Sequence, residues 1–324
     1  MTRIYDCFLY NNERELLSIR LQLLAPIVHK FVIVWSSETF TGIKKKSGTF
    51  PLDLVKSPDL EGRIEIIELP ALIGKNAWDK EAFSRNTLLR GIAEANSSDL
   101  IMVSDVDEIP RPSVLTDLAR QPHRDYPIVL GQDYYNFKFN YKLMHGYRAV
   151  WAGPVLCRPQ AFKSMQELHN KRLNLLESPD SCVEDAGWHF SYLTATEDVS
   201  NKLMSFSHQE KNIQSRGAKK ISSLIATRQG FHDHLYPGSV WAVVALSSLG
   251  CPDLERLISK CPPLVICDNA DDSRAVDRSI RNSVRRLCNY ERSKIISWYR
   301  WRELLVELLK RLRRRISSVV LRTP

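Results

Sequence analysis

The first 110 residues alternate between short apolar runs and stretches in which apolar residues recur at helical spacing. Continuous apolar runs of this length are typical of strands buried on both faces. Such runs occupy residues 31–35 and 100–103, and strands are also predicted over residues 4–10 and 63–69. Between them we expect a helix capped by Asn12, with Glu15 as its capping-box partner, and a second helix from Asn76 to Asn96. This order predicts an α/β fold with a mostly parallel sheet and right-handed crossovers.

The pattern changes after Pro112, where aromatic residues become frequent. A strand is predicted over residues 126–130, and aromatic side chains crowd the segments 133–137 and 151–154. Aromatic rings suit the apolar faces of sugars, but clustered rings also fill ordinary protein cores. The sequence leaves both interpretations open.

The 324 residues are enough for one large domain with an appendage. We expect a domain over residues 1–269 and a tail over 270–324. Seven cysteines without a CxxC pair indicate neither a zinc site nor a disulfide framework, so a reducing cytoplasm is the expected location. We expect no leader peptide before the first strand, and no apolar run approaches the roughly 20 residues of a membrane span.

The net charge of +9 belongs mainly to the end of the chain. Residues 292–324 contain ten Lys and Arg against Glu303 and Glu307, which leaves 36 basic and 35 acidic residues in the rest of the chain. A nearly neutral body argues against a broad groove for nucleic acid. From Trp298 onward, apolar residues at helical spacing are interleaved with Lys and Arg. This basic amphipathic helix is typical of attachment to an anionic membrane surface. The second interpretation is a helix that docks on the body or pairs with another chain, and the third is a helix that binds nucleic acid.

The densest group of chemically capable residues follows the strand at 100–103. Asp105, Asp107 and Glu108 lie within four residues, and Pro110 and Pro112 are expected to exclude an ordinary ladder or helix after them. Carboxylate oxygens at the carboxyl end of a parallel strand suit Mg²⁺ or Mn²⁺ together with a substrate diphosphate. The alternative is a solvated turn, since Asp-x-Asp is a common tripeptide. Neither a GxGxxG sequence nor a Walker lysine loop is present.

Four stretches, in this order and spacing, resemble glycosyltransferase family 17, which contains the bisecting N-acetylglucosaminyltransferase of N-glycans. They are residues 6–13 with Ile19 and Arg20, residues 31–34, residues 105–110, and residues 187–191 with 205–208. The resemblance extends over about residues 1–269. It implies a GT-A-like, Rossmann-type α/β fold with helices flanking the sheet. It also implies an inverting transfer of a sugar, typically N-acetylglucosamine from its UDP donor, with a divalent metal.

The resemblance also suggests roles for individual residues. Asp107 would bind the metal directly, Asp105 would contact the ribose or a metal-bound water, and Glu108 would orient the two or serve only a structural role. The complete set of expected metal ligands is Asp105, Asp107, His189 and His208. The expected donor-binding residues, besides Asp105, are Arg85, Asn86, Asn11, Glu13 and Lys202. Helix capping or surface exposure could explain several of these positions without a binding role.

An inverting transfer requires a carboxylate that takes the proton of the acceptor hydroxyl. Glu184 and Asp185 precede the Gly-Trp-His sequence, where related enzymes commonly place this base, and Asp185 is preferred. Asp133 and Glu210 are the alternatives. The expected acceptor is a glycan or a lipid-linked sugar. Two rival functions remain open from the sequence: a metal-dependent phosphohydrolase or nucleotidyltransferase, and a non-catalytic nucleic-acid-binding protein that uses the basic tail.

Overall fold

The structure is a computed structural model, and it describes residues 2–45, 49–121, 124–146, 149–193, 218–230, 233, 238–266 and 279–287. The strands are β1 (Ile4–Tyr10), β2 (Lys30–Ser36), β3 (Ile64–Leu69), β4 (Leu100–Asp105), β5 (Glu108–Pro110), β6 (Ile128–Asn136), β7 (Tyr141–His145), β8 (Val150–Cys157), β9 (Cys182–Val183), β10 (Gly187–Ser191) and β11 (Val240–Val243). The α-helices are α1 (Arg14–Leu24), α2 (Ala77–Thr87), α3 (Pro112–Ala119), α4 (Met165–Asn170), α5 (Arg172–Leu176), α7 (Ala218–Ala226) and α8 (Pro252–Ile258).

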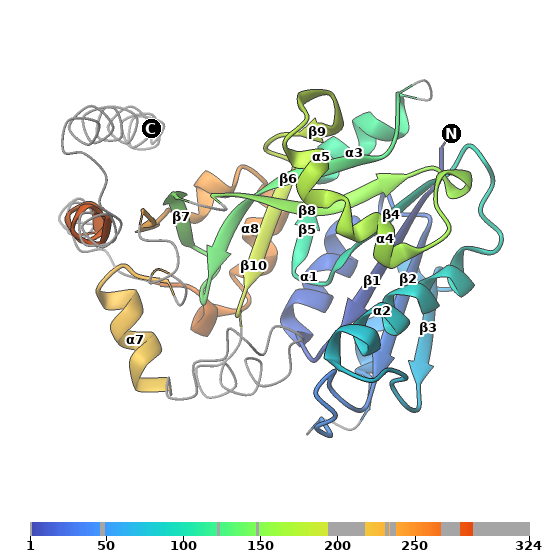
Figure 1. The fold of residues 1–324 in the computed structure, drawn as a ribbon, viewed down its shortest axis with the longest axis horizontal. Helices are drawn as coiled ribbons and strands as arrows, with labels where there is room; N and C mark the ends of the chain where they lie inside the picture. The colour runs from blue at the N-terminus through green and yellow to red at the C-terminus, as the bar shows by residue number, and fades with distance from the viewer. Residues whose placement is uncertain are drawn as a thin grey trace.

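Within the described residues, the strands form one mixed sheet with the main order β11-β7-β6-β8-β4-β1-β2-β3 (Figure 1). The four strands β3, β2, β1 and β4 are parallel, as expected from the sequence. The expectation of a mostly parallel sheet is wrong for the other half, because β8, β6, β7 and β11 pair antiparallel. Short connections such as that between β6 and β7 permit only antiparallel neighbours, whereas parallel strands require a crossover.

Two apolar layers cover opposite faces of the parallel strands, because successive strand residues point to opposite sides. One layer joins Phe8 and Ile33 to apolar residues of α1, α3 and α8. The other joins Cys7 and Val34 to residues of α4 and of the 3₁₀ turn Leu88–Ile92. The carboxyl ends of β1, β2 and β4 meet at one edge of the sheet, since the three strands run in the same direction.

Several local features differ from the sequence expectation. Asn12 has a φ of +71° and does not cap α1, which begins after Glu13 without a side-chain cap. Asn76 caps α2 as expected, by accepting hydrogen bonds from the amides of Trp78 and Asp79. The helix then tightens into the 3₁₀ turn at 88–92 instead of continuing to residue 96.

The two prolines after the carboxylates do not break regular structure. Pro110 ends β5, which pairs antiparallel with β10, and Pro112 lies in the first turn of α3. The first turn of a helix accepts proline because its amides have no partner within the helix. The aromatic segment 133–137 also belongs to regular structure, since β6 runs from Ile128 to Asn136.

Part of the expected tail packs on the body. Residues 279–287 are helical, with Ser279 and Ser283 buried. Ser279 Oγ accepts a hydrogen bond from the amide of Trp241 at 3.1 Å, and Arg286 donates to the carbonyl of Ser239 at 2.9 Å. The basic amphipathic stretch from Trp298 onward lies outside the described residues. Across the described part of the chain, no helix combines the length and apolar character needed to cross a membrane.

Candidate active site

The turn between β4 and β5 carries the three carboxylates. Arg20 of α1 fixes this turn from the interior of the protein. Arg20 is fully buried and forms an ion pair with the equally buried Asp6, at 2.6 Å. The same guanidinium donates to the carbonyls of Asp105, at 3.0 Å, and Glu108, at 2.8 Å. It also donates to Ser104 Oγ at 2.7 Å. One buried cation therefore holds the backbone of the whole turn.

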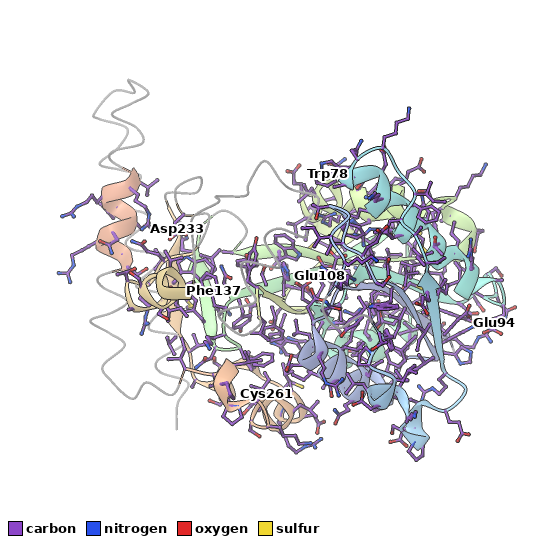
Figure 2. All side chains as sticks on the ribbon, turned by 90° about the horizontal axis from the view of Figure 1, so that it is seen from below. Trp78, Glu94, Glu108, Phe137, Asp233 and Cys261 are labelled. Atoms are coloured by element: carbon purple, nitrogen blue, oxygen red, sulfur yellow. The ribbon has the colours of Figure 1, made fainter. Side chains whose placement is uncertain are left out.

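A cavity of about 460 Å³ lies above this turn, at the carboxyl ends of β1, β2 and β4. Asp105, Asp107, Arg85 and His189 line it. Glu108 lies in the interior, whereas Trp78 is at the edge of the molecule (Figure 2). Trp78 is 44% exposed and lines the cavity. Open α/β sheets bind ligands at this edge, so the fold places the carboxylates where a substrate site is expected.

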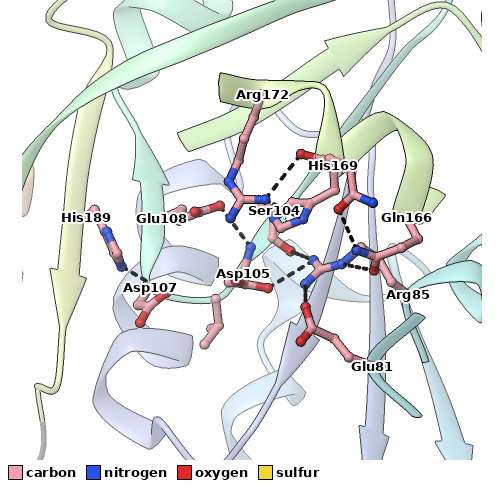
Figure 3. Close-up of polar contacts among 12 residues, drawn as sticks. Glu81, Arg85, Ser104, Asp105, Asp107, Glu108, Gln166, His169, Arg172 and His189 are labelled. Carbon is pink, nitrogen blue, oxygen red and sulfur yellow. Dashed lines mark hydrogen bonds and ion pairs between the residues drawn. The ribbon is translucent and has the colours of Figure 1, made fainter. Parts of the chain in front are cut away.

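Asp107 and His189 come from distant segments and face each other in the cavity (Figure 3). Asp107 Oδ1 and His189 Nε2 are 3.6 Å apart. The amide of Phe190 donates to the carbonyl of Asp107 at 2.9 Å, so the pairing of β10 fixes the position of both residues. The imidazole of His189 lies against Trp151, with ring centroids 4.1 Å apart, and meets Tyr134 edge to face at 5.1 Å.

The separation of Asp107 and His189 fits a divalent cation. At 3.6 Å the two atoms are too far apart for a good hydrogen bond. Two ligands that each bind one ion at about 2.1 Å are roughly 3–3.7 Å apart, depending on the angle at the ion. An oxygen and an imidazole nitrogen are suitable ligands for Mn²⁺ and related ions. These two residues are therefore the best candidates for holding the metal that the sequence predicts.

Asp105 has a different environment, because it pairs with the buried Arg85 (Figure 3). Arg85 NH1 contacts Asp105 Oδ1 at 3.0 Å, and NH2 contacts Glu81 at 2.8 Å. Gln166 accepts from Arg85 Nε at 3.0 Å. Burial alone would lower the pKa of Arg85, but the charges of Asp105 and Glu81 raise it above its ordinary value. The Asp105 side chain is 43% exposed, so one carboxylate is fixed by a permanent cation and still accessible to a ligand.

Glu108 supports the turn from within the protein. It is 1% exposed, and its carboxylate accepts hydrogen bonds from Trp151 Nε1 at 2.7 Å and from the amide of Asp105 at 3.1 Å. Burial, and then the negative charge of Asp105, raise the pKa of Glu108. These contacts fit the orienting role considered from the sequence.

Asn11, Glu13 and Lys45 line the cavity near the ends of β1 and β2. Glu13 Oε2 accepts a hydrogen bond from the amide of Asn11 at 2.9 Å. Burial lowers the pKa of Lys45 to about 8. Asn86, another expected donor-binding residue, does not line the cavity; its side-chain oxygen accepts from Ser164 Oγ at 2.9 Å and thus anchors the start of α4.

The structure does not bring Glu184 and Asp185 to the cavity. Because β10 runs antiparallel to β5, with His189 opposite Glu108 and Gly187 opposite Pro110, residues before Gly187 lie beyond the far end of β5. The Asp185 side chain is 76% exposed and pairs with Arg111 at 2.7 Å. The alternative base Asp133 pairs with Lys142 at 2.6 Å, away from the cavity lining.

Lys202, His208 and Glu210, which the sequence also suggested, lie outside the described residues.

A group of cavity residues was not anticipated from the sequence. It comes from α4 and the start of α5: Gln166, His169, Asn170, Arg172 and Leu173. These short helices lie between β8 and β9, and no motif or charge cluster in the sequence distinguishes them. Lys45 is also new, since it belongs to a lysine run that the sequence indicates to be an ordinary loop.

The mixed sheet and the cavity at the edge of its parallel strands define an α/β protein with the architecture of an enzyme. Residues 1–239 match the family model described as glycosyltransferase family 17. The chain belongs to glycosyltransferase family 17 and is an enzyme of sugar transfer.

Comparison with curated proteins gave no match. Solved structures that resemble the chain include Staphylococcus aureus TarS residues 1–349, with 13% identity and a TM-score of 0.36, covering 90% of this chain and 92% of that one. The galactosyltransferase LgtC, in complex with donor and acceptor sugar analogs, has 11% identity and a TM-score of 0.27, covering 56% of this chain and 73% of its own.

Proposed function

We propose that this enzyme is a metal-dependent, inverting glycosyltransferase that moves N-acetylglucosamine from UDP-N-acetylglucosamine to a hydroxyl of a glycan or a lipid-linked sugar. The proposal includes a GT-A-like donor site in the cavity above the β4–β5 turn. The observation that carries it is the facing pair Asp107 and His189, 3.6 Å apart, beside the Asp105–Arg85 ion pair. The donor and the inversion come from the resemblance of the motifs to family 17.

Different residues of the cavity would bind different parts of the donor. Asp107 and His189 would hold Mn²⁺ or Mg²⁺, whose charge offsets the negative charge that develops on the departing diphosphate. Lys45, which lines the same cavity from the loop after β2, would neutralise phosphate oxygens of the donor. Trp151 and Tyr134 are stacked with centroids 5.6 Å apart and offer apolar ring faces to a sugar. The partly exposed Trp78 and Leu173 at the rim offer an apolar surface to the acceptor.

A donor screen tests this function. Purified enzyme is incubated with UDP-N-acetylglucosamine, UDP-galactose, UDP-glucose and GDP-mannose, each with Mn²⁺ or with EDTA, and release of the nucleoside diphosphate is measured. We expect Mn²⁺-dependent release from UDP-N-acetylglucosamine, and its loss in Asp107→Asn. The matched control is Asp117→Asn, because Asp117 is an exposed residue of α3.

Metal-independent turnover, or equal turnover by the wild type and Asp107→Asn, would contradict the site assignment. Preference for another nucleotide sugar would correct the donor alone. The anomeric configuration of the product, determined by NMR, tests inversion.

A further inference from the structure

His169 is a buried histidine with an unusual position in the cavity. It lies in α4, is 3% exposed and contributes to the cavity lining. Ligand-capable atoms of His169, Asp105 and Glu108 all lie within 4.8 Å of one another. Among the described residues, its Nε2 has no hydrogen-bond partner. A buried polar atom without a partner is costly, and a bound ligand is one way to satisfy it.

The contact with Arg172 determines which ring nitrogen carries the proton. Arg172 NH1 is 2.8 Å from His169 Nδ1 and also donates to the carbonyl of His169 at 3.2 Å. A guanidinium can only donate hydrogen bonds, so Nδ1 must accept. Burial, together with the charges of Arg85 and Arg172, lowers the pKa of His169 well below its ordinary value, which keeps the ring neutral. The remaining proton is therefore on Nε2.

In this tautomer, His169 cannot bind a metal through Nε2. A ring nitrogen binds a metal through its lone pair, and a protonated Nε2 has none available. Asp105 is also paired with Arg85, and Glu108 already accepts two hydrogen bonds. His169 Nε2 is thus a hydrogen-bond donor without a partner, on a ring that has a nitrogen within 4.8 Å of a carboxylate oxygen of Asp105.

We propose that His169 Nε2–H and the carboxylate of Asp105 together bind one hydroxyl group of the donor sugar, and that His169 thereby determines which sugar is accepted. A hydroxyl can accept from the imidazole and donate to the carboxylate at the same time. A phosphate oxygen cannot bind in this position, because its negative charge would face the negatively charged carboxylates of Asp105 and Glu108. The inference rests on the proposed function, since it assigns the sugar end of the same donor site. Arg172 is a positioning residue that fixes the tautomer.

The experiment compares deoxy analogues of UDP-N-acetylglucosamine. Turnover efficiency, kcat/KM, is measured for the parent donor and for analogues lacking the hydroxyl at C3, C4 or C6. The proteins are the wild type, His169→Leu, His169→Gln and the exposed-site control His29→Leu. We expect the wild type to discriminate against one analogue by about tenfold, the value of one hydrogen bond. In His169→Leu this discrimination disappears for that analogue alone, and His169→Gln, whose amide can donate, restores part of it.

A second readout does not depend on turnover. In ¹⁵N-histidine-labelled protein, the ring nitrogen shifts of His169 should show a proton on Nε2, and Arg172→Met should mix the two tautomers. Unchanged discrimination in His169→Leu, an unprotonated Nε2, or weaker Mn²⁺ binding by His169→Leu would each overturn the inference. Failure of the wild type to use any nucleotide sugar would instead refute the proposed function, a different result from turnover with unchanged discrimination.

Discussion

Variants of Arg20 should show that this residue contributes separately to the stability of the fold and to the geometry of the site. Arg20 and Asp6 are both fully buried and joined at 2.6 Å. In Arg20→Met, Asp6 remains as a buried charge without its cation, which costs about 3–5 kcal/mol of unfolding free energy. In the double variant Asp6→Leu/Arg20→Met, both charges are absent, and the part of this loss that comes from the unpaired charge should be recovered. The carbonyls of Asp105 and Glu108 still lack their donor, so the double variant stays less stable than the wild type.

The two variants should nevertheless share a catalytic defect. In both, the carbonyls of Asp105 and Glu108 lose the guanidinium that fixes the turn. A displacement of about 1 Å in a reacting group can reduce the rate about a hundredfold. We therefore expect kcat/KM of the double variant to stay about a hundredfold below that of the wild type, although it is more stable than Arg20→Met.

Urea unfolding followed by circular dichroism gives the free energies, and donor turnover at low temperature, corrected for the folded fraction, gives the activity. Wild-type activity in the double variant would show that Arg20 only neutralises Asp6 and does not position the turn. A loss of less than about 1 kcal/mol in Arg20→Met would refute the assignment of a critical buried ion pair.

Three further predictions concern the metal, the pH dependence and the stability of the site. Removing metal with EDTA should abolish turnover, Mn²⁺ should restore it, and Asp107→Asn or His189→Ala should reduce Mn²⁺-supported kcat/KM at least about a hundredfold; unchanged Mn²⁺ titrations in both variants would contradict the ligand pair. The pKa of Lys45 is lowered to about 8, so Lys45 loses its charge as the pH rises through that value. KM for the donor should then rise about tenfold between pH 7 and 9 in the wild type but not in Lys45→Gln, and parallel profiles would exclude a phosphate contact. Burial and the Asp105 charge raise the pKa of Glu108, so the folded state loses stability as the pH rises through that pKa. In metal-free buffer the urea midpoint of the wild type should therefore fall more between about pH 4 and pH 7 than that of Glu108→Gln, which has no ionisable group at this position; equal falls in the two proteins would show that ionised Glu108 is not penalised.

The parallel half of the fold and the carboxylate turn could be predicted from local sequence. Apolar runs such as 100–103 identify buried strands, and the order of strands and helices implies parallel crossovers. The antiparallel half could not be predicted, because the aromatic run 133–137 has no clear period and fits a strand or a loop equally well. The placement of β10 beside both β5 and β6 depends on contacts between residues far apart in the sequence.

Site residues that belong to a sequence motif could be predicted. Site residues that reach the cavity only through packing of the folded chain could not. Asp107 and His189 belong to recognisable motifs, and the structure places them together. His169 and Arg172 carry no such signal, because their significance comes from a short helix that lies against the carboxylates. Asp185 shows the opposite problem: its distance from His189 in sequence is small, but the extended strand between them carries it away from the cavity.

The position of β10 has a consequence for how the enzyme becomes active during its synthesis. Asp107 emerges from the ribosome about eighty residues before His189, and β5 has its partner strand only once β10 has been made. A nascent or prematurely terminated chain that ends before residue 187 therefore has only one residue of the proposed ligand pair, and its β5 has no β10 to pair with. Because this assembly depends on pairing between distant segments, it should be among the slow steps of folding. Under the proposed metal assignment, metal binding would then distinguish completed chains from unfinished ones.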